Sequence, residues 1–215
     1  MKNKPEYIYV TGAPGSKWSS VIKNIYWSDD VNHSDYSKER TYYHDADSPG
    51  RPQLMHLGAY LDPGMEFGTF EFDAPFTGDG IKIVKSHTLA HSLNHSNWPN
   101  ESERGWHTPG CPLILVYRND VECYEWWKKC GGFNITYPLY NDYYTDLDSM
   151  WDHIVRQNND IMTFVKRNFN RVQRVYNNQA LCEILNISHN IATDGEDVSV
   201  YHDYTKKDIQ VYVYK

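Results

Sequence analysis

The 215-residue sequence contains little cysteine and no long apolar run. Its four cysteines, Cys111, Cys123, Cys130 and Cys182, form no Cys-x-x-Cys pair and are too sparse for a disulfide scaffold, so we expect buried or partly buried thiols. No apolar stretch approaches the roughly 20 residues that span a bilayer, and no signal-peptide segment precedes the first strand-like run. These absences predict a soluble, cytoplasmic protein that does not enter a membrane.

Positive charge is also in short supply. The chain has 21 Lys and Arg against 28 Asp and Glu, a formal net charge of -7, which disfavours a surface for nucleic acid or anionic lipid. No internal repeat and no low-complexity linker divides the sequence, so we expect one domain over residues 1–215, of unknown oligomeric state. Aromatic side chains, in contrast, are abundant: 18 tyrosines and seven tryptophans make a substantial core possible.

Three short apolar runs are predicted to be buried strands, at residues 7–10, 81–84 and 113–117. None shows the polar alternation of a half-exposed strand, which favours a parallel sheet covered on both faces. The fold class is therefore α/β, with a mainly parallel central sheet flanked by helices. Residues 28–80 are rich in Asp, His, Ser, Gly and Pro and predict long ordered loops around short pieces of structure.

One helix is expected at about residues 18–27, and a second is expected to begin at a cap at Asn119 or Asp120. A third is expected at about residues 147–168, where apolar residues recur at helical spacing. NNQALCEILNIS, beginning at residue 177, is a further helix candidate. Near the end, VSVYH and IQVYVYK alternate as the two strands of a C-terminal β-hairpin would.

The stretch TGAPGSKWSS at residues 11–20 directly follows the first predicted strand and opens the first predicted helix. Gly12 and Gly15 permit close backbone approach, and the N–H groups of the first helical turn point at any anion in the loop. This arrangement predicts a phosphate or sulfate cradle. An ATP-binding loop needs Gly directly before its lysine and Ser or Thr directly after it, whereas Ser16 and Trp18 stand there. Magnesium-assisted ATP chemistry is therefore disfavoured, and a tight turn without a ligand is the alternative.

Polar and charged side chains also follow the other two strands. Lys85, Ser86 and His87 come directly after the second strand, and Arg118 ends the third. Because carboxyl ends of parallel strands meet at one edge of a sheet, these groups should lie near the loop. A lysine and a histidine there can supply charge stabilisation and a general base, and a guanidinium can bind a second phosphate. The alternative for the arginine is pairing with an acidic residue of the next helix, Asp120 or Glu122.

In these three elements the sequence resembles the PAPS-dependent sulfotransferases, whose donor is 3′-phosphoadenosine 5′-phosphosulfate. The loop ending in Trp18 is similar to the family's 5′-phosphosulfate loop, residues 85–87 to its Lys-Thr-His element, and LVYRND at residues 115–120 to its 3′-phosphate element. The matches span residues 7–132. The Trp-rich helix and tyrosine-rich middle also resemble, more loosely, uncharacterised sulfotransferase-like proteins of marine phages.

The resemblance implies a P-loop-like three-layer fold and transfer of a sulfuryl group to a hydroxyl of a carbohydrate, alcohol or phenol, without a metal. It implies that His87 deprotonates the acceptor and that Lys85 and Lys17 stabilise the leaving phosphate. The expected donor-binding residues are Gly12, Ala13, Pro14, Gly15, Ser16, Lys17, Trp18, Ser19, Arg118 and Cys123.

Three features depart from the family pattern. The loop lysine stands at Lys17 rather than before the Ser-Gly pair, and the serine expected eight positions after the arginine falls at Trp126, so Cys123 or a backbone amide would replace it. The C-terminal Arg-Lys-Gly run that closes over the donor has no counterpart; the basic pairs at residues 206–207 and 166–167 are the candidate substitutes.

Other functions stay open at this point. A nucleotide or nucleoside kinase with a degenerate ATP loop would need a magnesium-holding acid, for which Asp73 and Asp120 are the candidates. A catalytically inactive nucleotide-binding scaffold would keep the loop without turnover. His87, His91 and His95 stand four residues apart, as zinc ligands on one helix face would, but no His-Glu-x-x-His motif accompanies them.

Overall fold

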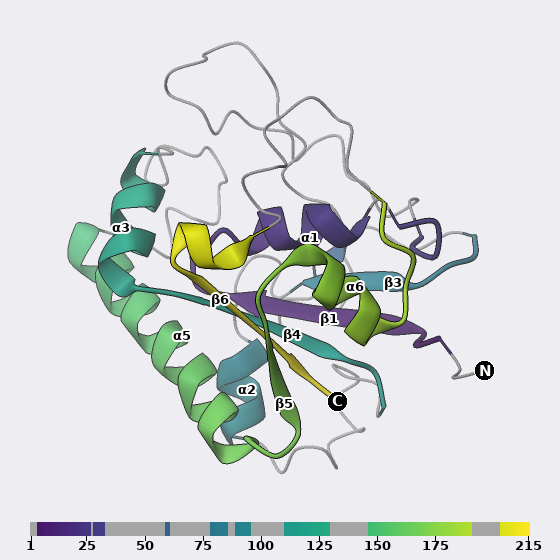
Figure 1. The fold of residues 1–215 in the computed structure, drawn as a ribbon. Helices are drawn as coiled ribbons and strands as arrows, with labels where there is room; N and C mark the ends of the chain where they lie inside the picture. The colour runs from purple at the N-terminus through teal and green to yellow at the C-terminus, as the bar shows by residue number, and fades with distance from the viewer. Residues whose placement is uncertain are drawn as a thin grey trace.

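The chain folds around a six-stranded mixed sheet with the strand order β2-β3-β1-β4-β6-β5 (Figure 1). The computed structural model describes residues 4–26, 28–32, 59–60, 78–85, 89–95, 110–129, 146–190 and 203–215. The strands are β1 (Tyr7–Gly12), β2 (Ala59–Tyr60), β3 (Lys82–Lys85), β4 (Leu113–Arg118), β5 (Val172–Val175) and β6 (Ile209–Tyr214). The helices are α1 (Trp18–Tyr26), α2 (Leu89–His95), α3 (Asp120–Lys129), α5 (Leu147–Arg167), α6 (Asn178–Leu185) and the 3-10 turn η4 (Tyr204–Lys207).

The three predicted buried strands are confirmed as the parallel centre of the sheet. β1 pairs in parallel with both β3 and β4, and Val10 is in register with Lys85 on one side and Ile114 on the other. All three strands therefore end at the same edge, as the sequence predicted. The last residues of these strands, Gly12, Lys85 and Arg118, are brought to this edge by backbone pairing alone.

The predicted C-terminal hairpin is wrong. β6 forms as expected, but it lies antiparallel between β4 and β5, and these neighbours occupy both of its edges over residues 211–214. A strand has only two hydrogen-bonding edges, so no edge is left there for VSVYH, which itself lies outside the described residues. The strand that takes this place, β5, was not predicted because its exposed middle residues, Gln173 and Arg174, hide the apolar pattern.

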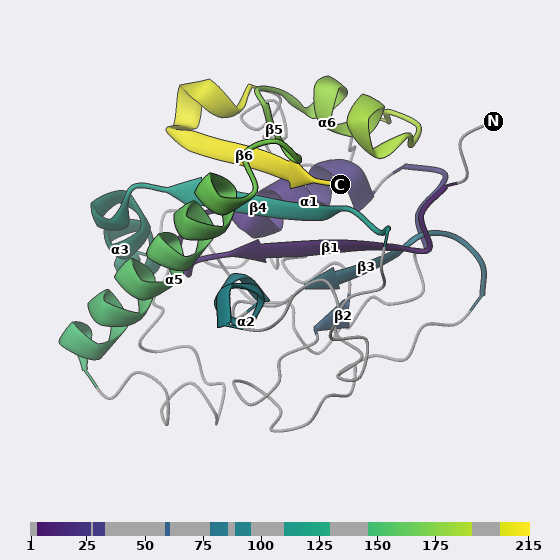
Figure 2. The same cartoon turned by 90° about the horizontal axis from the view of Figure 1, so that it is seen from below.

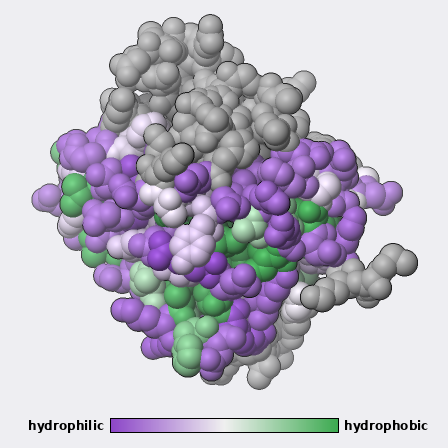
Figure 3. Space-filling model, in the orientation of Figure 1, coloured by the Kyte–Doolittle hydropathy of each residue, from purple (hydrophilic) through white to green (hydrophobic). Residues whose placement is uncertain are grey.

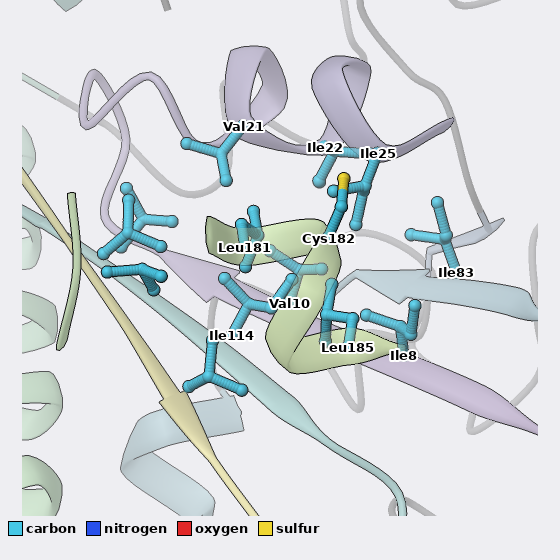
Figure 4. Close-up of a cluster of buried hydrophobic side chains, with 14 of the residues drawn as sticks. Ile8, Val10, Val21, Ile22, Ile25, Ile83, Ile114, Leu181, Cys182 and Leu185 are labelled. Carbon is cyan, nitrogen blue, oxygen red and sulfur yellow. The ribbon is translucent and has the colours of Figure 1, made fainter. Parts of the chain in front are cut away.

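Helices cover both faces of the sheet, which gives three layers (Figure 2). On one face α1 and α6 pack on the central strands, with Val21, Ile22 and Leu181 among the side chains directed at Val10 and Ile114 (Figure 4). On the other face α2 and α5 pack on the alternate strand residues, including Tyr9, Leu113 and Leu115. The predicted α/β class with flanking helices is therefore confirmed.

The predicted helices form close to their expected bounds. α5 begins in a reciprocal capping box, in which the Asp146 side chain accepts from the Ser149 backbone N–H and the Ser149 hydroxyl is within 3.2 Å of the Asp146 N–H. α6 ends at Asn186, which adopts the left-handed conformation that such caps favour. Capping residues in the sequence thus fix where these helices start and stop.

The surface seen in Figure 3 mixes apolar and hydrophilic side chains over the described residues. Four large hydrophobic side chains of the described residues are exposed, namely Val121, Leu147, Phe169 and Tyr176. None of the helices described here has the length and apolar character needed to cross a membrane. Most of the loop region predicted for residues 28–80 lies outside the described residues.

Candidate functional site

The loop after β1 packs its backbone tightly against its surroundings. A Cβ atom on Gly12 would lie 2.7 Å from the Ser16 Oγ and 2.8 Å from the Trp18 Cβ. Gly15 has a φ of +77°, and a Cβ there would lie 2.0 Å from the carbonyl oxygen of Cys123 on α3. Both glycines therefore allow the loop backbone to pack closely against its protein neighbours, and Gly15 lets the loop contact the first turn of α3.

Ser16 lies inside this loop. Its backbone N–H donates to the carbonyl of Ala13 over 3.0 Å, which turns the chain back toward the start of α1. The side chain is 0% exposed, and its Oγ has no hydrogen-bond partner among the described residues. This buried hydroxyl lies beside Gly12, at the N-terminal and therefore positive end of the nine-residue helix α1. It is suited to donate a hydrogen bond to an anion in the loop.

Arg118, at the end of β4, reaches across to the same loop. Its Nη1 donates to the carbonyl of Gly15 at 3.3 Å and to the carbonyl of Glu122 at 3.1 Å, and its Nη2 forms a 2.9 Å ion pair with the Glu122 carboxylate. The residue is 8% exposed, and its Nε has no hydrogen-bond partner within the described part of the chain. The expected proximity to the loop is thus present, and so is the pairing with Glu122 that was the alternative to phosphate binding.

The two lysines assigned to catalysis occupy different environments. Lys85 ends β3, is 0% exposed, and is aligned with Val10 of β1. Lys17 adopts a left-handed φ of 64°, and its Nζ lies 3.7 Å from the ring centroid of Trp126 on α3. The loop lysine is therefore directed toward α3 in this structure.

Trp18 and Cys123 are used for packing. Trp18 is 4% exposed and belongs to the core beneath α1, so in this arrangement its ring is covered by protein rather than open to an adenine. The Cys123 thiol is 0% exposed and donates to the carbonyl of Arg118 at 3.4 Å. Burial raises the pKa of this thiol to about 12, so it is neutral at physiological pH.

Some of the predicted site residues do not belong to the described part of the chain. Ser86 and His87 lie outside the described residues, as does the side chain of Ser19, whereas Ala13 and Pro14 form the buried start of the loop. The histidine side chains of the zinc alternative lie outside them too, and no group of three or more potential metal ligands occurs among the side chains that the structure describes.

The strand register distinguishes the two basic pairs, residues 206–207 and 166–167, that are candidates for closing over a donor. Arg118 is in register with Ile209, so η4, which directly precedes β6, lies at the loop edge of the sheet. The basic pair at residues 166–167 ends α5 beside the start of β5, which is in register with the opposite end of β4 through Tyr214. Of these two segments, the backbone of residues 206–207 is therefore the one that lies at the loop edge of the sheet.

Asn158 of α5 is a site component that the sequence reasoning missed. This residue is 2% exposed, and its Nδ2 donates to the carbonyl of Arg118 at 2.8 Å and to the Asp120 carboxylate at 2.6 Å. It thereby fixes the turn that carries Arg118. The available signal was an amide at a core-facing position of the helix, in a stripe that also contains the buried His153 and Gln157.

A pocket of about 480 Å³ opens beside this turn. Its walls include Asn119 and Glu122 from the start of α3, Arg174 from β5, and Thr205 and Asp208 from the η4 region. The pocket joins the carboxyl end of β4 to the 3-10 turn that precedes β6. Its charged walls are one guanidinium, Arg174, and two carboxylates, Glu122 and Asp208, so it can accept a polar group next to the Arg118–Glu122 pair.

Comparisons with family models, curated proteins and solved structures yielded no match to this chain.

Proposed function

We propose that the protein is a sulfotransferase that binds 3′-phosphoadenosine 5′-phosphosulfate at the loop of residues 12–18 and transfers its sulfuryl group to an acceptor hydroxyl. The observation that carries the proposal is the contact between Arg118 and the Gly15 carbonyl. It joins the two elements assigned to the 5′ and 3′ ends of the donor, beside the buried Ser16 hydroxyl. A P-loop-like architecture is part of this proposal and is supported by the parallel β3-β1-β4 centre.

Each of the proposed site residues has a separate role in this reaction. The α1 N-terminus and Ser16 hold the 5′ end, and Arg118 holds the 3′-phosphate. The sulfur–oxygen bond to the donor phosphate breaks as a new one forms to the acceptor oxygen, whose proton passes to His87. Lys85 and Lys17 stabilise the negative charge left on the phosphate, as cations do in phosphoryl transfer.

The geometry gives less support to an ATP-dependent kinase. Asp120, a candidate magnesium ligand, accepts a 2.6 Å hydrogen bond from the buried Asn158 and helps to fix the β4–α3 turn. The residue after the loop lysine is Trp18, which packs in the core and offers no hydroxyl to a metal. The sulfuryl donor, which needs no metal, therefore fits these residues better.

The role of His87 separates catalysis from binding. We expect His87→Ala to lower transfer from the labelled donor to an acceptor by at least about 100-fold, because a general base typically contributes that much. Affinity for 3′,5′-adenosine bisphosphate, the donor product, should change less than about threefold, since the proposed base acts on the acceptor and not on this product. An equal loss of binding and transfer would contradict a role as base, and full activity would remove His87 from the mechanism. His189→Ala, in the segment that follows α6, is the matched control.

A further inference from the structure

Both cations that the proposed function directs at the donor, Arg118 and Lys17, contact the same helix. Arg118 pairs with Glu122 at 2.9 Å, and the Lys17 ammonium lies 3.7 Å from the ring centroid of Trp126. Glu122 and Trp126 are four residues apart on α3, a spacing that places them on one helix face. One face of α3 thus holds both charges.

The contacts with Glu122 and Trp126 occupy the two cationic groups that a bound anion would need. The Nη1 of Arg118 donates to two backbone carbonyls, so the nitrogens left for a ligand are Nη2, which must exchange its Glu122 partner, and Nε, which has no hydrogen-bond partner among the described residues. The Glu122 side chain is 52% exposed and lines the 480 Å³ pocket, whereas that of Arg118 is 9% exposed. A ligand entering the pocket therefore meets the carboxylate before it meets the guanidinium.

We propose that Glu122 and Trp126 form a resting face on α3 that holds Arg118 and Lys17 in the ligand-free protein and releases them to a bound anion. This inference rests on the proposed function, because it concerns the anion site formed by the loop and Arg118. A phosphate dianion competes with one carboxylate for the guanidinium more effectively than a monoanion does. Glu122 and Trp126 are accordingly specificity residues that favour ligands with two separated, multiply charged groups.

An ordinary helix-stabilising ion pair is the competing explanation for Glu122. Pairs at this spacing are common on helices and contribute modestly to stability. Such a pair would affect unfolding without affecting anion affinity. The inference instead predicts that removal of the Glu122 charge increases affinity, and that the increase requires Arg118.

The test uses the full chain and 3′,5′-adenosine bisphosphate as the probe, titrated calorimetrically at low ionic strength. Glu122→Gln should bind the bisphosphate roughly three- to tenfold more tightly than the unmodified protein, because the ligand no longer displaces a carboxylate. The matched control is Glu125→Gln on the same helix, whose carboxylate pairs with Lys128 at 3.2 Å. It removes the same charge and should change affinity by less than about twofold. Trp126→Leu should also tighten binding.

A double variant separates a local from a general electrostatic effect. In the Arg118→Gln background, Glu122→Gln should no longer increase affinity, because the cation that it releases is absent. If Glu122→Gln and Glu125→Gln behave alike while the unmodified protein binds the probe, the inference fails and the proposed function stands. If the unmodified protein and Glu122→Gln both fail to bind the bisphosphate, both ideas are overturned.

Discussion

At the scale of single residues, Gly15 links the loop to the rest of the site. Three described glycines, Gly15, Gly78 and Gly110, share a φ between +77° and +84°. A Cβ on Gly78 or Gly110 would meet nothing within 4 Å, whereas one on Gly15 would overlap the Cys123 carbonyl at 2.0 Å. The backbone conformation is common to all three, so the steric contact with α3 is what distinguishes Gly15.

Gly15→Ala should therefore damage both stability and binding. We expect a loss of about 3 kcal/mol or more in the free energy of unfolding, from the left-handed φ and from displacement of α3, together with loss of bisphosphate binding. Gly110→Ala carries the same φ penalty without the overlap and should lose only about 1 kcal/mol while binding normally. Urea unfolding and calorimetric titration of both variants measure the difference. Equal stability losses would show that the loop can move away from α3.

Single-residue chemistry was partly readable from the sequence. Gly12 and Gly15 were predicted to permit close approach to the backbone, and in the structure their close neighbours are Ser16 and Trp18 of the same turn and Cys123 of α3. The partners of Arg118 were left open between ligand and protein. Its contact with Gly15 joins residues that are 103 positions apart, and nothing in a local pattern encodes such a distance.

At the scale of elements, apolar pattern and capping signals predicted most of the fold. The three central strands are buried on both faces, so their sequences are continuous apolar runs that are easily recognised. β5 is an edge strand with two exposed polar residues in its middle, and such a segment reads as a loop. The position of β6 between β4 and β5 depends on long-range pairing, which is why a local hairpin was predicted instead.

α5 shows how a correctly predicted element can still conceal site residues. Its bounds were predicted within one residue, because apolar residues recur along it at helical spacing. Its buried stripe nevertheless includes His153, Gln157 and Asn158. The amide of Asn158 reaches the β4–α3 turn only because α5 packs beside α3 and β4, an arrangement that helix periodicity does not reveal.

At the scale of the whole molecule, buried thiol and phenol groups make the free energy of unfolding depend on pH in the alkaline range. Burial raises the pKa of both Cys123 and Cys182 to about 12, and burial also raises the pKa of the Tyr204 hydroxyl. An unfolded thiol has a pKa of roughly 8.5. Between these values the unfolded chain has lost protons that the folded chain retains, so stability is fully present below the lower value and falls as pH rises toward the upper one.

The free energy of unfolding should therefore be insensitive to these thiols up to about pH 8 and then decrease by about 1.4 kcal/mol per pH unit for each fully buried thiol. Urea unfolding at pH 8, 9 and 10 measures this slope. Cys123→Ala should reduce the slope, whatever its effect on stability at pH 7. An unchanged slope in that variant, or constant stability up to pH 10, would mean that the thiols are accessible in the folded protein.

The central claim is that the loop of residues 12–18, with Arg118 beside it, holds a nucleotide carrying phosphates at two positions. Its most direct test is calorimetric titration of the unmodified protein with 3′,5′-adenosine bisphosphate, beside a titration with ATP and magnesium. We predict saturable binding of one bisphosphate per chain and none of ATP. Binding of ATP alone would assign the loop to a kinase, and binding of neither nucleotide would show that TGAPGSKWSS is a structural turn.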